Sequence, residues 1–193
     1  MSDIKVIVEG SGKHCHVTRA TLDVLFGAGF ELEMKKWLSQ PGQFATPHKI
    51  TVVGPKGETT LSIIGPCRPV DQIELSFTDA RAIGLSCPVR ESGDVAGSPG
   101  CKLIGPAGEI DIDCGAIIAK RHIHLTPEDA AKFGLTDKQI VQVRVEGDQG
   151  RALIFDDVVA RVNPEYATFM HIDYDELNAA GALGKGPIGV VLK

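Results

Sequence analysis

Two pairs of histidines have the same form, because in each pair a single residue separates the two imidazoles. His122 and His124 form one pair, and His14 and His16 form the other in the N-terminal part of the chain. Alternate side chains of an extended strand point to the same face, so each pair presents two nitrogen ligands to one point. This spacing is typical of a metal site built on a strand.

A third candidate ligand accompanies each pair. Glu74 and His171 are each followed by an acidic residue five positions later and by a glycine ten positions later. Both stretches are typical of a strand that ends in a short helix closed by glycine. The sequence therefore predicts an internal repeat with two three-ligand metal sites: His14, His16 and Glu74 in one, and His122, His124 and His171 in the other.

Three protein ligands leave one position of a tetrahedral zinc ion open, which is the catalytic rather than the structural pattern. The alternative is that these histidines are hydrogen-bonded polar groups at the rims of β-barrels. Five of the six histidines belong to the repeat, and only His48 lies outside it. This concentration favours metal binding.

Arg68 is a candidate for binding an anion near the first site. It precedes Glu74 by six residues and lies between two prolines, Pro66 and Pro69, which restrict its backbone. A guanidinium beside a metal is suited to a bidentate contact with phosphate or carboxylate. The alternative is a surface ion pair with Asp71, and the spacing alone leaves both interpretations open.

The elements that carry these residues are short strands and a few short helices. Thr18 and Thr126 follow the two histidine pairs and are suited to cap helices. Cys15 should face away from the ligands into a core. A helix is expected over 18–38, interrupted near Gly27 and Gly29. Strands are expected over 3–9, 50–53, 59–64, 72–76, 101–104, 109–112, 140–145, 151–155, 158–162, 168–172 and 188–192, many of them joined as hairpins.

The predicted fold class is mainly β with short helices, because hairpin-connected strands favour barrels or sandwiches over a doubly wound sheet. Two small barrels fit the repeat. The net charge of −5 and the 5% aromatic content argue against nucleic-acid binding. Five cysteines without a CxxC pair, no signal peptide and no long apolar run indicate a reduced, soluble, cytoplasmic protein without a membrane partner.

The chain also resembles a known family, the Pdu-type phosphate acyltransferases (phosphotransacylases) of the bacterial microcompartments for propanediol utilisation, and their cytosolic relatives. The resemblance implies transfer of a short acyl group between coenzyme A and inorganic phosphate, and extends over most of the chain. The matching segments are 14–16, 65–68, 72–74, 88–94, 121–124 and 171–178.

The resemblance implies a fold of two helix-capped β-barrels with the active site in the cleft between them. Residues 13–119 would form the first domain, and residues 120–193 the second, completed by the N-terminal strand within residues 1–12. It further implies two zinc ions per chain held by the two predicted ligand sets, phosphate binding by Arg68, and a contact of Asn178 with coenzyme A. A homodimer would be usual for the family.

Two departures from the family pattern bear on these expectations. Lys13 stands where the family usually has arginine. The first strand begins by residue 3 or 4, which leaves no room for the amphipathic extension of encapsulated members. This indicates either a cytosolic version or association with a microcompartment by another route. Two other functions remain open: a dinuclear zinc hydrolase of a thioester or phosphate ester, and a metal-stabilised scaffold without turnover.

Overall fold

The computed structural model describes residues 4–147, 149–184 and 186–192. The contacts divide the chain into two compact units. The unit called here the barrel unit contains the segment that ends at Ser11, residues Ser39–Pro41, and the chain from Lys120 onward. The unit called the sheet unit contains Gly12–Leu38 and Gly42–Ala119.

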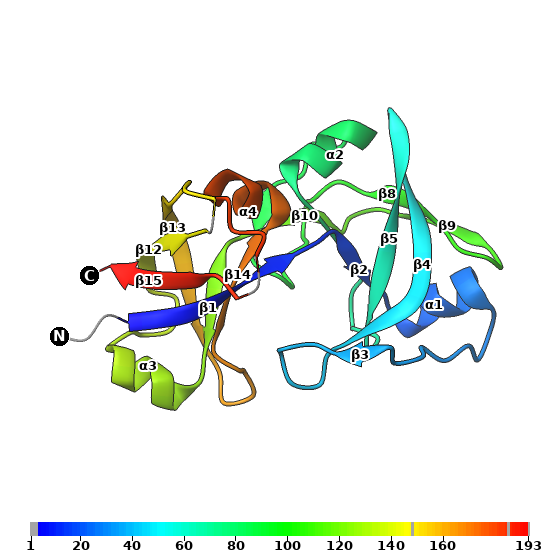
Figure 1. Ribbon diagram of the computed structural model, residues 1–193. Coiled ribbons are helices and arrows are strands. Elements are labelled where there is room, and N and C mark those ends of the chain that lie inside the picture. The colour runs from blue at the N-terminus through cyan, green and yellow to red at the C-terminus, as the bar shows by residue number, and fades with distance from the viewer. Residues whose placement is uncertain (1–3, 148, 185, 193) are drawn as a thin grey trace. The chain divides into compact units, whose positions relative to one another are not determined.

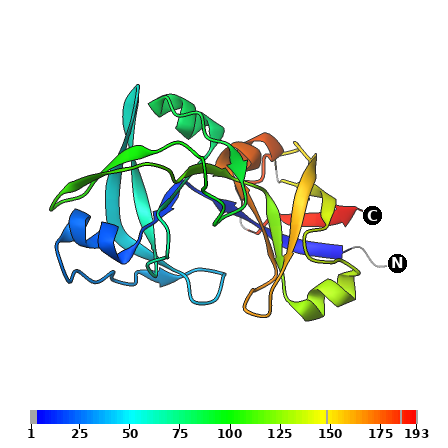
Figure 2. The ribbon, with the colours of Figure 1, turned by 180° about the vertical axis from the view of Figure 1, so that it is seen from behind.

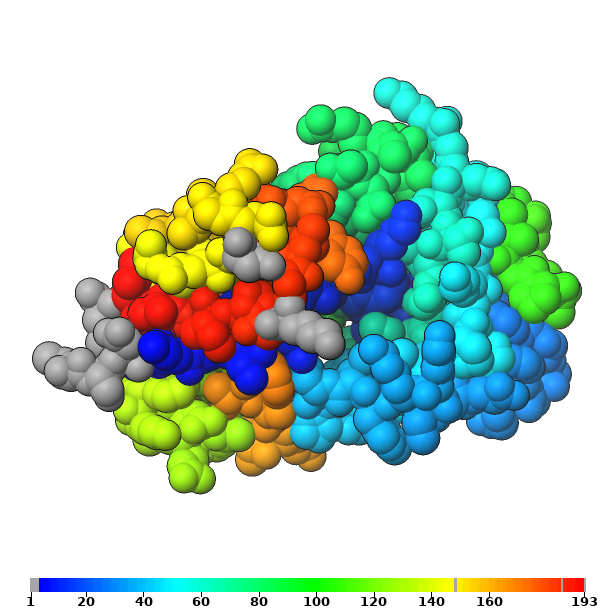
Figure 3. Space-filling model, viewed as in Figure 1, coloured from blue at the N-terminus to red at the C-terminus, as the bar shows by residue number. Residues whose placement is uncertain are grey.

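The barrel unit is a closed barrel of six strands in the order β1-β14-β11-β13-β12-β15. The first strand of the chain closes the barrel by pairing with the last strand, and the two lie against each other as blue and red atoms in Figure 3. The elements of this unit, labelled in Figure 1, are β1 (Ile4–Ser11), β11 (His122–Leu125), α3 (Pro127–Phe133), β12 (Ile140–Glu146), β13 (Leu153–Val162), β14 (Phe169–Asp173), α4 (Tyr174–Ala180) and β15 (Ile188–Leu192).

The sheet unit is one curled sheet in the order β7-β10-β6-β2-β5-β4-β8-β9, with β3 paired to β4. Its longest strands, β4 and β5, form a twisted hairpin that is clear from behind in Figure 2. Its elements are β2 (His14–His16), α1 (Arg19–Phe26), β3 (Lys36–Trp37), β4 (Phe44–Gly54), β5 (Gly57–Gly65), β6 (Gln72–Leu75), α2 (Phe77–Ile83), β7 (Val89–Arg90), β8 (Cys101–Ile104), β9 (Glu109–Ile112) and β10 (Ala116–Ala119).

The predicted fold class is confirmed, since the chain is mainly β with short helices in two barrel-like units. The strand that precedes each histidine pair does not join the unit that contains that pair but pairs within the other unit. β1 precedes the first histidine pair but pairs in parallel with β14 of the barrel unit. β10 precedes the second pair but pairs in parallel with β6 of the sheet unit.

Each strand that carries a candidate ligand is followed immediately by a capped helix. Thr18, Ser76, Thr126 and Asp173 are the N-caps, and each side chain accepts a hydrogen bond from a backbone N–H in the first turn. These bonds satisfy N–H groups that lack a partner inside the helix. The cap therefore fixes where each ligand strand ends, which fixes the direction of its side chains.

Each unit has its own apolar core, formed by the inward-facing residues of its strands and by its helices. Cys15 belongs to the core of the sheet unit and is fully buried, as predicted. Burial raises the pKa of its thiol, because a thiolate loses its hydration there. Cys15 is therefore a packing residue rather than a nucleophile.

Two predictions of secondary structure were wrong. The helix expected over 18–38 spans only Arg19–Phe26, and Gly27 ends it with φ of 100°. The strands expected over 151–155 and 158–162 are one strand, β13, whose register shifts opposite β12 at a bulge where Asp157 has φ of 53°. Among the described helices, none has the length and hydropathy needed to cross a membrane.

Candidate metal centres

The sheet unit brings together His14, His16 and Glu74, as the sequence predicted. One ligand atom from each lies within 4.8 Å of the others. β2 runs antiparallel to β6 with His14 directly opposite Glu74, so the register itself places the carboxylate beside the imidazoles. All three side chains belong to buried residues.

Both imidazoles of this centre turn the same nitrogen toward the carboxylate. Nδ1 of His14 lies 2.8 Å from the carbonyl oxygen of Gly12, and Nδ1 of His16 lies 3.2 Å from that of Ile64. A carbonyl only accepts hydrogen bonds, so each Nδ1 carries the proton and each Nε2 is left with a lone pair. The Nε2 atoms lie 3.5 Å and 4.0 Å from the two oxygens of Glu74.

The carboxylate of Glu74 is held from its other side. Gln72 donates a hydrogen bond of 2.6 Å from its side-chain nitrogen to Oε1 of Glu74, and the Ser92 hydroxyl donates one of 3.3 Å to the same oxygen. The amide oxygen of Gln72 accepts from the backbone N–H of Gly93 at 2.7 Å. Because these bonds engage Oε1, Oε2 remains directed at His14.

The electrostatics of this centre favour the metal-binding forms of Glu74 and His16 but not of His14. Burial alone would lower the pKa of His14, but Glu74 and the carbonyl of Gly12 outweigh it and raise that pKa. Burial alone would raise the pKa of Glu74, but His14, with smaller contributions from His16 and Arg68, outweighs it and holds that pKa below its usual range. Burial, reinforced by His14 and Arg68, lowers the pKa of His16 to about 3. Glu74 is therefore ionised and His16 neutral near pH 7, as metal coordination requires.

Arg68 lies next to this centre. Its backbone N–H donates to the carbonyl of Val17, one residue after His16, and its guanidinium donates to the Ser92 hydroxyl at 3.3 Å. Asp71, the predicted alternative partner, instead accepts bonds of 2.7 Å from the Thr18 backbone N–H and from a threonine hydroxyl of α1. Arg68 thus presents a positive charge beside the ligands.

The barrel unit brings together His122, His124 and His171, again with one ligand atom from each within 4.8 Å. β11 runs antiparallel to β14 with His122 directly opposite His171, which repeats the register of His14 and Glu74. Nδ1 of His122 lies 2.7 Å from the carbonyl of Lys120, two residues earlier, just as His14 bonds two residues back. The two centres are built by the same local rule.

The donor atoms of the barrel-unit centre fit a metal ion. Nδ1 of His171 is buried and has no hydrogen-bond partner among the described residues. A buried imidazole nitrogen without a partner costs free energy unless something else binds it. Three converging imidazoles are the preferred donors of zinc and neighbouring transition metals, so this donor set fits a metal cation.

A basic residue in front of each histidine pair forms an ion pair with the helix that follows the third ligand. Lys13 lies 3.1 Å from Asp79 of α2, and Arg121 lies 2.9 Å from Glu176 of α4. These are the acidic residues five positions after Glu74 and His171. Lys13 makes a single contact to the carboxylate where an arginine could make two, but the pairing is present.

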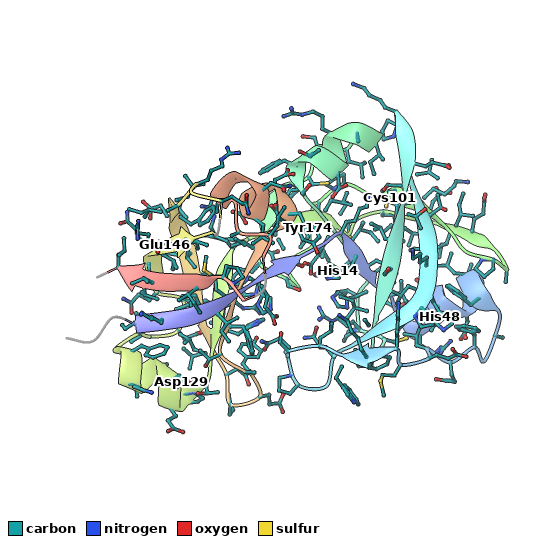
Figure 4. All side chains as sticks on the ribbon, in the orientation of Figure 1. His14, His48, Cys101, Asp129, Glu146 and Tyr174 are labelled. Atoms are coloured by element: carbon teal, nitrogen blue, oxygen red, sulfur yellow. The ribbon has the colours of Figure 1, made fainter. Side chains whose placement is uncertain are left out.

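The structure also places the predicted coenzyme A contact, the sixth histidine, and several residues near the ligands that had no predicted role. Asn178 is exposed on α4, and no described contact joins it to the histidines. His48, labelled in Figure 4, packs edge-on against Phe26 and Phe30 in the sheet unit, which explains why it stands outside the repeat. Residues near the ligands that received no predicted role are Gln72, Ser92, Glu9 and Tyr166, whose ring lies 4.2 Å from that of His124.

Comparisons with known proteins agree with this geometry. The family model of phosphate propanoyltransferase matches residues 7–183. The phosphate propanoyltransferase of Enterococcus faecalis is 53% identical over 187 residues, covering 96% of this chain and 87% of that protein. Proteins of the same name from Listeria monocytogenes and Thermotoga maritima are 50% and 49% identical, over 97% and 91% of this chain and 87% and 83% of theirs.

Proposed function

Because the chain belongs to the phosphate propanoyltransferase family, we propose that it transfers a short acyl group between coenzyme A and inorganic phosphate with two bound zinc ions. The observation that carries this proposal is the pair of three-ligand clusters, one with an arginine tethered beside it. We assign the ligands as His14, His16 and Glu74 in the sheet unit and His122, His124 and His171 in the barrel unit.

Zinc bound at such centres supplies electrostatic stabilisation to oxygen and sulfur atoms that carry developing negative charge. Arg68 binds inorganic phosphate through charge-assisted hydrogen bonds and orients one phosphate oxygen toward the thioester carbonyl carbon. The oxygen–carbon bond forms while the carbon–sulfur bond breaks, so the products are acyl phosphate and the thiolate of coenzyme A. Phosphate is already an anion at pH 7, and no separate strong base is needed.

The surroundings of Arg68 support this role. Its guanidinium donates to the Ser92 hydroxyl, which in turn donates to Glu74, so one side chain bridges the guanidinium and the carboxylate. We further propose that Asn178, exposed on α4, contacts coenzyme A. We also propose that residues 13–119 form one domain and residues 120–193, with the strand before residue 13, form the other.

The test measures thiol release from acetyl-CoA and propanoyl-CoA with and without phosphate, together with the metal content of the purified protein. Two zinc ions per chain and strictly phosphate-dependent release are expected. Release without phosphate would identify a hydrolase instead. Bound metal without release from either thioester would favour a scaffold and contradict the acyltransferase proposal.

The role of Arg68 has a separate test. Arg68→Ala should raise the KM for phosphate about 10- to 100-fold, the range expected for losing hydrogen bonds to a charged group. Arg81→Ala, at an exposed arginine of α2, is the matched control and should leave the KM unchanged. Equal effects of the two substitutions would contradict the assignment.

A further inference from the structure

Arg68 lies in a segment without regular secondary structure, between the end of β5 at Gly65 and the start of β6 at Gln72. Its backbone N–H donates to the carbonyl of Val17 at 3.0 Å. Its guanidinium donates to the Ser92 hydroxyl at 3.3 Å, and the residue is half-buried. A segment of this kind keeps a fixed position only where tertiary contacts tie it to the fold.

Asp71 ties the far end of this segment to α1. Its carboxylate oxygen Oδ1 accepts a hydrogen bond of 2.7 Å from the Thr18 backbone N–H. Its other oxygen, Oδ2, accepts one of 2.7 Å from the Thr21 hydroxyl. Hydrogen bonds to a charged group are stronger than those between neutral groups. Both donors belong to the N-terminus of α1, directly after the strand that carries His14 and His16.

The backbone of Asp71 is itself held on the side of β10. Gly115, just before that strand, has φ of 139°, and a Cβ there would lie 2.9 Å from the carbonyl oxygen of Asp71. The carbonyl of Gly115 accepts from the backbone N–H of Ile73 at 2.9 Å. β10 and β6 then pair in parallel from Ala116 and Ile73 onward. The carboxylate therefore extends from a closely packed backbone, and its two bonds to α1 are called here the Asp71 clasp.

We propose that Asp71 is a positioning residue for phosphate binding, because its clasp holds residues 66–71 against α1 and thereby fixes the place of the Arg68 guanidinium. The inference rests on the proposed function, in which Arg68 binds inorganic phosphate. A bidentate guanidinium contact needs both N–H groups aligned with the phosphate oxygens. A misplacement of about 1 Å can cost about 100-fold in rate.

The barrel unit has a clasp of the same kind without an arginine. Thr168 lies three residues before the third ligand of its centre, as Asp71 does. Its hydroxyl accepts from the Thr126 backbone N–H at 3.4 Å and donates to a carboxylate of α3 at 2.5 Å. The residue three positions before Thr168 is Glu165, where Arg68 stands in the other half. The clasp is thus a shared feature of the fold, and the one in the sheet unit holds an arginine.

The competing interpretation is that Asp71 only stabilises α1. A carboxylate at the N-terminus of a helix is favourable by itself, because it accepts from N–H groups that lack a partner in the helix and complements the helix dipole. Substitution of Asp71 would then lower stability without a specific effect on phosphate. The two interpretations predict different results when Arg68 is also removed.

The first test measures the steady-state kinetics of the zinc-loaded enzyme with phosphate and propanoyl-CoA. Asp71→Ala should raise the KM for phosphate about tenfold, the lower end of the effect expected for removing Arg68 itself, and leave the KM for propanoyl-CoA unchanged. Asp71→Asn keeps an oxygen for the Thr18 N–H and should recover most of the loss. In an Arg68→Ala background, Asp71→Ala should have no further effect on the KM for phosphate. An equal effect with and without Arg68 would overturn the inference.

Asp23→Ala is the matched control. Asp23 lies on the same helix and also accepts from one side chain, that of Arg19 at 2.6 Å, and from one backbone N–H, that of Gly29 at 3.0 Å. Neither donor belongs to the segment of Arg68. Asp23→Ala should lower stability in urea unfolding, as Asp71→Ala does, but leave the KM for phosphate unchanged. Equal increases of that KM in the two variants would overturn the inference.

Metal content separates an effect on Arg68 from an effect on the sheet-unit centre. Glu74 is held by Gln72 and Ser92 independently of the clasp, so Asp71→Ala should retain the zinc content of the wild-type protein. Loss of zinc from Asp71→Ala would assign the residue to the metal centre rather than to Arg68 and would overturn the inference.

The second test follows the Arg68 backbone amide by hydrogen exchange in NMR spectra, without measuring activity. Asp71→Ala should speed its exchange about tenfold, because the segment loses two hydrogen bonds to α1, whereas Asp23→Ala should not change it. Unchanged exchange in Asp71→Ala would overturn the inference and leave the proposed function standing. Thiol release that ignores phosphate in the wild-type protein would instead contradict both the proposed function and the role of Asp71 in it.

Discussion

Gln72 is a buried residue whose side chain hydrogen-bonds to the carboxylate of Glu74 in the sheet-unit centre. Its side-chain nitrogen donates to Glu74 at 2.6 Å and to the Ser92 hydroxyl at 2.8 Å, and its oxygen accepts from the Gly93 backbone at 2.7 Å. Gln72→Met keeps the length of the side chain but removes both donors and the acceptor. It leaves a buried carboxylate oxygen and a backbone N–H with fewer partners.

The size of the effect follows from those three bonds. Losing a hydrogen bond to a charged group costs about 1.5–3 kcal/mol, and leaving a buried N–H unsatisfied costs about 1–3 kcal/mol. Methionine returns some apolar burial at the same volume. We expect a loss of about 3 kcal/mol in the unfolding free energy of the sheet unit. With a urea slope of about 2 kcal/mol/M, the midpoint falls by about 1.5 M.

The assay is urea unfolding of metal-free protein, followed by zinc titration of the same samples. Zinc affinity at the sheet-unit centre should fall about 10- to 100-fold, because Glu74 loses the contacts that orient it. The matched control is Gln142→Met, since Gln142 also donates to a carboxylate, that of Asp156, at 3.0 Å but on an exposed strand. Its effect should be under about 0.5 kcal/mol.

The comparison of Gln72→Met with Gln142→Met tests whether burial makes the hydrogen bonds of Gln72 important for stability. If Gln72→Met and Gln142→Met shift the urea midpoint equally, burial does not make the Gln72 bonds important, and the reasoning is refuted. If stability falls but zinc affinity does not, Gln72 supports the fold without orienting Glu74.

Three further predictions concern the elements around the centres. Thr126→Ala removes a helix cap and should lower the unfolding free energy by about 1 kcal/mol in urea titrations; no change would show that α3 does not depend on its cap. Gly100→Ala would place a Cβ 2.0 Å from a carbonyl oxygen of β9, so it should cost about 1–3 kcal/mol, whereas Gly57→Ala, with no neighbour closer than 3.5 Å, should cost under about 1 kcal/mol. Burial raises the pKa of Cys87 to about 11 and, as the largest of three causes, that of Cys101 to about 12. Their alkylation rates should therefore rise about tenfold per pH unit from pH 7 to 10, as mass spectrometry can check, and rapid alkylation at pH 7 would contradict the burial argument.

The sequence predicted the parts of the site that depend on local spacing. Alternation along a strand brings two histidines to one face, and a threonine directly afterwards ends that strand at a helix cap. The third ligands were found because Glu74 and His171 occur in similar local patterns. All of these signals lie within about ten residues of one another, where strand and helix geometry determine the outcome.

The unpredicted parts depend on pairing between distant segments. Glu9 meets His171 only because β1 joins the barrel beside β14, and nothing near Glu9 in the sequence indicates that neighbour. Ser92 reaches Glu74 from a loop rich in glycine and proline, which carries no periodicity. The helix expected over 18–38 failed for a different reason. Phe30, inside the expected range, lies beyond the end of α1 and stacks on Phe26 with the ring centroids 4.7 Å apart.

The pairing of β1 with β14 and β15, which lie far from it in the sequence, has a consequence for folding during synthesis. β1 is synthesised before the other described elements, whereas its partners β14 and β15 are the last strands to be synthesised among them. About 160 residues separate the end of β1 from the start of β14, which is roughly ten to thirty seconds of translation. During that time both edges of β1 lack their native partners, while the residues of the sheet unit are already available to fold. A nascent barrel unit should therefore be the form of this protein that most needs a chaperone.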